Sequence, residues 1–301
     1  MTFKTWAIRM GVAASMTALS VSALAQNNFD DVKITTQKLT DTVYVLFGAG
    51  GNIGVSVGED GVFIIDDQFA PLTERIKAAI AELSDQPIRF AINTHFHGDH
   101  TGGNENLGKE GTVIVAHDNV RVRMSQSAFN RTFNRRSEAK PKAALPVVTF
   151  NDRASLHLNG DTARMHHVRR AHTDGDSIVE FEKDNVLHMG DTFFVGRFPF
   201  IDVDSGGTID GVIGSTKTAI AIADDNTQVI PGHGPVTDRE GLRAYLKMLE
   251  DSRDRVAKLK ADGKTLDEIR AAKPLADYEE TITGGGADWT NAYIGFVFNS
   301  L

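Results

Sequence analysis

The sequence contains no cysteine among its 301 residues. Disulfide bonds, thiolate metal ligands, a cysteine nucleophile and a lipid attached to cysteine are therefore all excluded. Any metal that this protein binds must be held by histidine and carboxylate side chains.

Long apolar runs are absent after the first 25 residues, so no later segment predicts a transmembrane helix or a stable membrane anchor. Cations are also scarce, because 32 lysines and arginines face 40 acidic residues, which gives a formal net charge of -8. This balance argues against a nucleic-acid partner. We expect a small-molecule substrate, and the sequence leaves a homo-oligomer open.

One stretch runs against this acidic balance. Residues 121–136 contain five arginines, namely Arg121, Arg123, Arg131, Arg135 and Arg136. For this stretch we favour a solvated helix face over an anion-binding lid.

Residues 1–25 carry the three parts of a secretory signal peptide in the right order. Lys4 and Arg9 form a positive region, residues 10–19 are apolar and small, and Ala23-Leu24-Ala25 matches an A-x-A cleavage site. We therefore expect export to a periplasm, or secretion. Residues 26–301 show no composition break and no internal repeat, which predicts a single mature domain.

Short apolar runs predict strands, and longer amphipathic stretches predict helices. The strands are expected over residues 43–46, 54–57, 62–65, 88–92, 112–115, 177–181, 186–189 and 228–230. The helices are expected over residues 72–83, 209–222 and 239–260, and residues 288–301 are interpreted as a packing helix or a subunit contact. This order favours sheets packed together with helices outside, an α/β sandwich.

The densest group of polar side chains follows the apolar run at residues 88–92. His95, His97, Asp99 and His100 fall within six positions. Alternate side chains of an extended segment leave on the same side, so the first three can converge on one point while His100 reaches a second point beside it. Burying these groups without partners would be costly. The arrangement favours a metal site, with two metals, over a polar surface turn.

Other candidate ligands stand just beyond predicted strands or apolar runs. They are Asp66, His172, Asp191 and His233. Loops beyond strand ends are where rigid scaffolds place chemistry. We favour a non-ligand role for the other five histidines, which sit at no motif position; of these, His166 and His167 come closest to being exceptions.

Taken in order, these motifs resemble the metallo-β-lactamase superfamily. The H-x-H-x-D-H signature is complete from His95 to His100, and the flanking elements follow in family order as Asp66, Ala171-His-Thr-Asp-Gly-Asp176, Met189-Gly-Asp191 and Pro231-Gly-His-Gly-Pro235. The resemblance spans residues 66–233. It implies an α/β (α+β) four-layer αββα sandwich, the metallo-β-lactamase fold, with a dinuclear metal site along one edge.

The resemblance also assigns a role to each position. The ligands of one metal would be His95, His97 and His172. The ligands of the other would be Asp99, His100 and His233, with Asp191 bridging the two. Asp66 resembles the family carboxylate that orients ligands rather than binding metal. These donors suit about two Zn²⁺ per chain, and they are also compatible with Mn²⁺ or iron.

The function implied is metal-dependent hydrolysis. Two metals would share a water and lower its pKa to about 7, so that a bridging hydroxide could cleave an ester, thioester, lactone or amide bond. Asp99 would be catalytic, as a ligand that also orients the hydroxide. The prediction is an exported dinuclear zinc hydrolase.

Two alternatives remain open. The first is β-lactamase activity, dedicated or promiscuous, although the β-lactamases proper typically carry Cys or Ser at the Asp191 position, and a common subgroup has Lys where this chain has Phe194. The carboxylate looks more like that of the glyoxalase II and lactonase branches. The second is an iron-dependent redox enzyme similar to the persulfide dioxygenases. Those enzymes use one iron and fewer ligands, whereas this chain keeps all seven.

The segment Thr192–Asp202 is expected to lie over the metals. Phe194, Arg197 and Phe198 are its candidate substrate-binding residues, because an apolar wall with one cationic anchor suits an acyl or aromatic substrate that carries an anion. An equal alternative is that the phenylalanines of this segment are core or subunit contacts.

Overall fold

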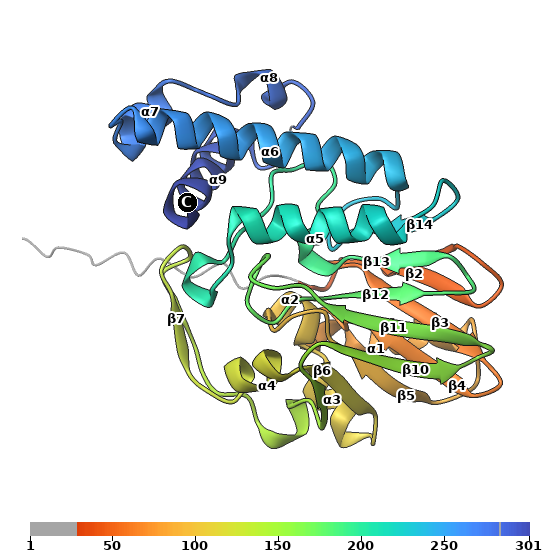
Figure 1. The fold of residues 1–301 in the computed structure, drawn as a ribbon. Helices are drawn as coiled ribbons and strands as arrows, with labels where there is room; N and C mark the ends of the chain where they lie inside the picture. Colours follow the sequence, from red (N-terminus) through yellow and green to blue (C-terminus); the bar gives the residue numbers. More distant parts are fainter. Residues whose placement is uncertain (1–28, 283) are drawn as a thin grey trace, which may run out of the picture. The chain divides into compact units, whose positions relative to one another are not determined.

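A computed structural model describes residues 29–282 and 284–301 of this protein. The predicted signal peptide lies outside the described residues. The chain from Val32 to Leu301 is one compact unit, and Figure 1 labels its helices and strands. No helix in the two described ranges is long and apolar enough to cross a membrane.

The first sheet has seven strands in the order β1-β2-β3-β4-β5-β6-β9. They are β1 (Thr35–Lys38), β2 (Val43–Phe47), β3 (Ile53–Gly58), β4 (Gly61–Ile65), β5 (Ile88–Ile92), β6 (Val113–His117) and β9 (Val148–Phe150). The first four pair antiparallel, whereas β4, β5, β6 and β9 run parallel. Because parallel strands end at the same edge, the loops after β4 and β5 lie beside each other.

The second sheet has five strands in the order β10-β11-β12-β13-β14. They are β10 (Arg153–Leu158), β11 (Asp161–His167), β12 (Ser177–Phe181), β13 (Val186–His188) and β14 (Gln228–Ile230). Only β13 and β14 pair in parallel. The hydrophobic pattern did not predict β10 and β11. Polar and apolar side chains are mixed along both strands and only some of them are buried, so neither strand contains a continuous apolar run.

The helical elements occupy the outside of both sheets. They are η1 (Ala70–Leu72), α1 (Thr73–Ala81), α2 (Gly98–Thr101), α3 (Asn104–Lys109), α4 (Asp118–Met124), η2 (Lys142–Ala144), η3 (Gly190–Thr192), η4 (Val203–Ser205), α5 (Ile209–Ile222), α6 (Arg239–Ala261), α7 (Leu266–Ala271), α8 (Ala276–Glu279) and α9 (Gly286–Ser300). The Thr208 and Asp238 side chains cap α5 and α6 by accepting hydrogen bonds from the backbone. The helices predicted over residues 72–83, 209–222 and 239–260 are confirmed.

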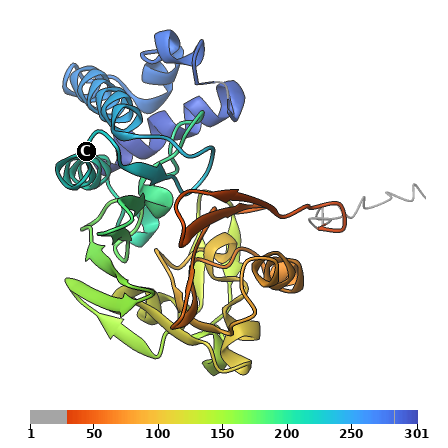
Figure 2. The ribbon, with the colours of Figure 1, turned by 90° about the vertical axis from the view of Figure 1, so that its right-hand side faces the viewer.

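The two sheets pack face to face through a shared apolar core. Phe63 of β4 stacks on Phe181 of β12 at the centre of this core, with 5.7 Å between the ring centres. A second core joins the other face of the second sheet to α5, α6 and α9. On the far side, α3 and α4 contact the first sheet, and α1 lies outside it (Figure 2). The layers therefore run helix, sheet, sheet, helix, as the predicted αββα sandwich requires.

The arginine-rich stretch at residues 121–136 is not one helix, so that interpretation was wrong. α4 ends at Met124, and β7 (Ala128–Asn130) pairs with β8 (Arg135–Ser137) as a separate antiparallel hairpin. The turn chemistry of two asparagines explains this. The Asn130 side chain accepts a hydrogen bond from the Phe133 N–H, and Asn134 adopts a φ of 48°, outside the helical region.

Candidate metal centre

Seven candidate ligands meet where strands of both sheets end. The first sheet supplies His95, His97, Asp99 and His100 after β5, and the second supplies His172, Asp191 and His233 after β11, β13 and β14. They form two groups, in each of which the ligand atoms lie within 4.8 Å of one another. We call His95, His97, His172 and Asp191 subsite 1, and Asp99, His100, Asp191 and His233 subsite 2.

The backbone after β5 explains why four neighbouring residues divide between two subsites. His97 is extended, with φ -66° and ψ 149°, and α2 begins at the next residue. His95 and His97 therefore point from an extended stretch, whereas Asp99 and His100 point from the first turn of a helix. The change of conformation at His97 separates the two pairs of side chains.

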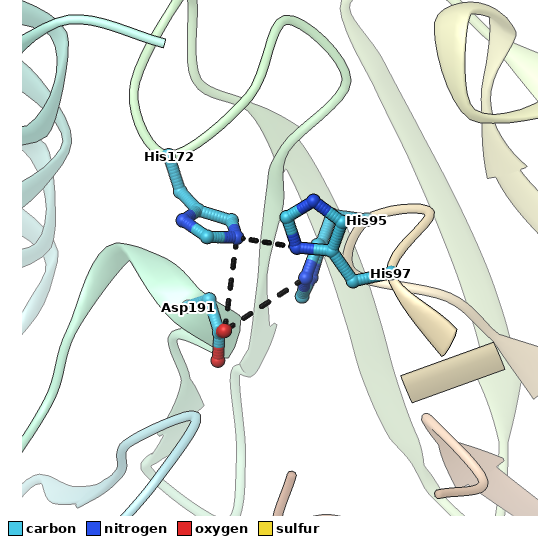
Figure 3. Close-up of side chains that lie close together, drawn as sticks. All are labelled: His95, His97, His172 and Asp191. Carbon is cyan, nitrogen blue, oxygen red and sulfur yellow. Dashed lines mark hydrogen bonds and ion pairs between the residues drawn. The ribbon is translucent and has the colours of Figure 1, made fainter. Parts of the chain in front are cut away.

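Subsite 1 is drawn in Figure 3, where its four side chains point toward one another. His172 Nε2 lies 2.8 Å from His97 Nδ1. Asp191 Oδ2 lies 3.7 Å from His172 Nε2 and 3.9 Å from His95 Nε2. A tetrahedral zinc site with bonds of about 2.0–2.2 Å places its ligand atoms about 3.3–3.6 Å apart. These separations straddle that range.

Subsite 2 uses the other oxygen of the same carboxylate. Asp191 Oδ1 lies 3.1 Å from His100 Nε2 and 3.3 Å from His233 Nε2. Asp99 Oδ2 completes the group at 3.4 Å from His233 Nε2 and 3.7 Å from His100 Nε2. Asp191 thus turns one oxygen toward each subsite, which is the geometry of a bridging ligand.

Buried atoms without partners show that a metal fits this centre. His95 Nε2 is buried and has no hydrogen-bond partner among the described residues, and the buried atoms His100 Nε2 and Asp191 Oδ1 also form no hydrogen bond there, although they lie 3.1 Å apart as a potential ion pair. Leaving such a group unsatisfied costs about 1–3 kcal/mol. A cation bound in each subsite would satisfy all three atoms at once.

Asp66 lies where the resemblance implied, behind the ligands of subsite 2. Its Oδ2 is 2.7 Å from His100 Nδ1 and also accepts a hydrogen bond from Thr94 Oγ1 at 2.8 Å. Its Oδ1 accepts from the Thr94 backbone N–H. Because this pairing engages Nδ1, it leaves His100 Nε2 directed at the subsite.

Asp202 and Phe200 hold the ligands of subsite 1, and no sequence pattern pointed to them for this role. Asp202 is buried, and its Oδ2 lies 3.0 Å from His97 Nε2. The Phe200 carbonyl oxygen is 2.7 Å from His172 Nδ1. The available signal was that Asp202 is an acidic residue at the end of an apolar segment, like Asp66 after β4.

Burial dominates the charge state of the subsite 1 histidines. Burial lowers the pKa of His172 to about 4, and the neighbouring His97 adds to this shift. The pKa of His95 lies well below its usual value, through burial and through His100 and His172. Both imidazoles are therefore neutral at pH 7 without a metal, which is the form that binds metal.

Carboxylates dominate in subsite 2. Burial opposes the charged form of His233, but Asp191 and Asp99 outweigh it and raise the pKa of His233 to about 9. The pKa of His100 is also raised, by Asp191, Asp99 and Asp66 against its burial. Burial in turn opposes ionisation of Asp99, but His100 and His233 lower its pKa to about 2. Without a metal, subsite 2 is a cluster of ion pairs.

The phenylalanines of the Thr192–Asp202 segment divide between the centre and the core. Phe194 stacks on His233 with 5.4 Å between ring centres, and Phe200 stacks on His97 at 5.7 Å. Phe198 is 1% exposed and stacks on Tyr293 in the core at 4.8 Å. The prediction that Phe198 binds substrate is corrected accordingly, because its ring packs on a core residue, whereas the equally buried ring of Phe194 packs on a candidate metal ligand.

Arg197 lies at the border of this aromatic group. Its guanidinium is 4.5 Å from the ring centre of Trp289 and 5.7 Å from that of Phe194. Phe194 and Arg197 are therefore placed together beside His233. The sequence pattern predicted only a packing helix or a subunit contact for the segment that contains Trp289.

His166 and His167 lie outside the centre. His166 Nε2 is 2.8 Å from Glu180 Oε2, and His167 Nδ1 is 2.8 Å from the Asp176 carbonyl oxygen. Neither residue belongs to a metal-binding group among the described residues.

The model of the metallo-beta-lactamase superfamily matches residues 47–260 of this chain. The chain belongs to this superfamily. It is 24% identical over 238 residues to the "Lactamase-like protein aptB" of Emericella nidulans, a match that covers 75% of this chain and 67% of that protein. Members of the superfamily are typically metal-dependent hydrolases, and the two ligand groups suggest a metal-binding site.

Two solved structures agree with the fold of this superfamily member. A metallo-beta-lactamase from Pontibacter korlensis has a TM-score of 0.61 at 18% identity, covering 73% of this chain and 100% of that chain. A double mutant of the sec-alkyl sulfatase PisA1 has a TM-score of 0.62 at 15% identity, covering 79% of this chain and 45% of that chain. Similarity at this level of identity shows a shared fold.

Proposed function

We propose that this protein is an exported dinuclear zinc hydrolase that cleaves an ester, thioester, lactone or amide bond. The observation that carries the proposal is the pair of ligand groups sharing Asp191 through its two oxygens. Their donors, five histidines and two aspartates, suit Zn²⁺. The signal-like pattern of residues 1–25 supports export and a mature chain that begins at residue 26. The absence of a composition break in residues 26–301 supports a single mature domain.

Two Zn²⁺ ions would supply an activated water at neutral pH and would polarise the bond under attack. Asp99 is the most accessible of the proposed ligands, with 28% of its side chain exposed. Its Oδ2 faces His100 and His233, so Oδ1 can accept a hydrogen bond from the attacking water and then hold its proton.

Phe194 and Arg197 are the proposed substrate contacts. Phe194 covers His233, and Arg197 is held over Phe194 and Trp289. Within residues 29–282 and 284–301, no carboxylate forms an ion pair with the Arg197 guanidinium. A cation positioned by two aromatic faces can bind the anionic group of a substrate.

Metal analysis of the purified protein tests the proposal. About two zinc ions per chain would support it. A single iron per chain would contradict it and favour the redox alternative.

A substrate panel tests the reaction itself. It comprises an aryl ester, an S-acylglutathione, an acyl-homoserine lactone and a chromogenic cephalosporin. Hydrolysis of the cephalosporin would support the β-lactamase alternative. Turnover that Asp99→Asn abolishes would support the proposal. Turnover unchanged in that variant would contradict the role given to Asp99.

A further inference from the structure

The β7–β8 hairpin forms a two-stranded sheet of its own among the described residues. In Figure 1 it runs from α4 toward the segment before α5. Most of its residues are exposed. Because an isolated hairpin of this kind is only marginally stable in water, its contacts with the rest of the molecule determine where it lies.

Two contacts hold the hairpin beside subsite 1. The ring of Phe133, in the turn, lies 5.0 Å from that of Phe200, which stacks on His97. The Arg131 N–H donates to Asp204 Oδ2 at 2.9 Å, and its guanidinium also pairs with Asp204. Asp204 follows two residues after Asp202, the partner of His97. The hairpin turn is therefore linked to His97 by a chain of ring contacts, and it is also paired with the backbone segment that contains Asp202.

The hairpin is also a local concentration of positive charge. Residues 131–142 contain five cations and one acid, in a chain of formal net charge -8. Arg135 and Arg136 are exposed and form no ion pair with any described residue. Phe133 is 54% exposed beside them. Positive charge next to an active site raises the local concentration of anions.

We propose that the β7–β8 hairpin selects substrates that join an apolar part to an anionic group. Phe133, which packs on Phe200, contacts the apolar part, and Arg135 and Arg136 attract the anion. This inference rests on the proposed hydrolytic function and deepens it by naming the substrate class, an anionic acyl or aryl compound.

The charge is tested by reversing Arg135→Glu and Arg136→Glu together in the zinc-loaded protein. Two 4-nitrophenyl esters are compared, one with a neutral acyl chain and one whose acyl chain ends in a carboxylate. We expect kcat/KM for the anionic ester to fall about tenfold, and that for the neutral ester to change by less than about twofold. Raising the salt concentration from about 0.05 to about 0.5 M should reproduce much of this loss in the unmodified protein.

The matched control reverses two exposed lysines at the end of α6 and in the loop after it, Lys258→Glu and Lys264→Glu, with the same change in net charge. It should leave the ratio of the two kcat/KM values unchanged. An equal loss in the control, or an unchanged ratio in the arginine variant, would overturn the proposal.

The apolar contact is tested by Phe133→Ala, with Phe129→Ala as the control. Both rings belong to the hairpin and are about half exposed, at 54% and 49%, but only Phe133 contacts a described ring beside the metal centre. We expect Phe133→Ala to raise KM several-fold at unchanged zinc content, and Phe129→Ala to leave KM unchanged. The same effect from both variants would overturn the role of Phe133.

A binding measurement separates this inference from the proposed hydrolysis. If neither these esters nor any compound of the substrate panel is cleaved, the hydrolytic proposal fails, and isothermal titration of the zinc-loaded protein with 4-phenylbutyrate still tests the hairpin. Weaker binding in the arginine variant than in the lysine control supports the inference, and equal binding overturns it. Light scattering of the Phe133→Ala protein tests a different role for the hairpin. Loss of a dimer in this variant would show that the hairpin forms a contact between subunits.

Discussion

The two candidate subsites share Asp191 but are prepared for metal in different ways. In subsite 1, burial lowers the pKa values of His95 and His172, to about 4 for His172. Subsite 2 holds imidazoles whose pKa values are raised by carboxylates, to about 9 for His233. A metal can therefore bind at subsite 1 without displacing protons from His95 and His172. At subsite 2 it must displace protons from His100 and His233.

The supports of the two subsites also come from different kinds of structure. His100 of subsite 2 is fixed by Asp66, which follows the core strand β4. His97 of subsite 1 is fixed by Asp202, which lies in the loop contacted by the β7–β8 hairpin. The support of subsite 1 is therefore the one that a change in the β7–β8 hairpin can reach, through the loop that contains Asp202 and Asp204.

The largest effect is expected from removing Asp191, the ligand that the two subsites share. Asp191→Ala takes one ligand atom from each, so both affinities should fall and activity should drop by several orders of magnitude. Metal analysis after dialysis should find about one metal ion per chain or fewer, while circular dichroism confirms that the fold persists. Two retained metals would show that Asp191 does not bridge.

A change confined to subsite 2 should affect metal binding there and leave metal binding at subsite 1 intact. Asp99→Asn removes the charge of one ligand there and leaves every ligand of subsite 1 in place. We expect retention of about one metal per chain and a loss of about 10²–10⁴ in kcat, since the proposed proton acceptor is also lost. Loss of both metals in this variant would mean that the two subsites fill only together.

The candidate ligands stood out in the sequence because each follows a strand end or an apolar run, and the resemblance to the metallo-β-lactamase superfamily divided them between two metals. The strands that pack between the sheets were predicted for the same reason. β1 could not be, since all four of its residues are exposed and leave no apolar pattern. Asp202 could not be paired with His97, because 105 residues separate them and only the folded loop brings them together.

The pH dependence of metal binding should also differ between the subsites. The pKa of His233 is raised to about 9 and that of His100 is also raised, so metal binding at subsite 2 displaces up to two protons, and metal affinity there should fall between about tenfold and about 100-fold per pH unit below about pH 9. His172, with its pKa lowered to about 4, should contribute no such fall at subsite 1 from pH 9 to about 5. Competition with a chelator of known affinity measures both. Equal slopes would remove the distinction between the subsites.

The smallest effect is expected from the supporting carboxylates, and it shows whether each acts on its own subsite. Asp202→Asn and Asp66→Asn keep the side-chain shape but replace a charged acceptor with a neutral one, which should cost about 10–100-fold in metal affinity. Chelator competition should assign the loss to subsite 1 for Asp202→Asn and to subsite 2 for Asp66→Asn. Both carboxylates are buried and lie within 3.0 Å of their histidines, so the two changes are matched. If each variant weakened both subsites equally, the shared Asp191 would transmit the change, and the subsites would have to be treated as one unit.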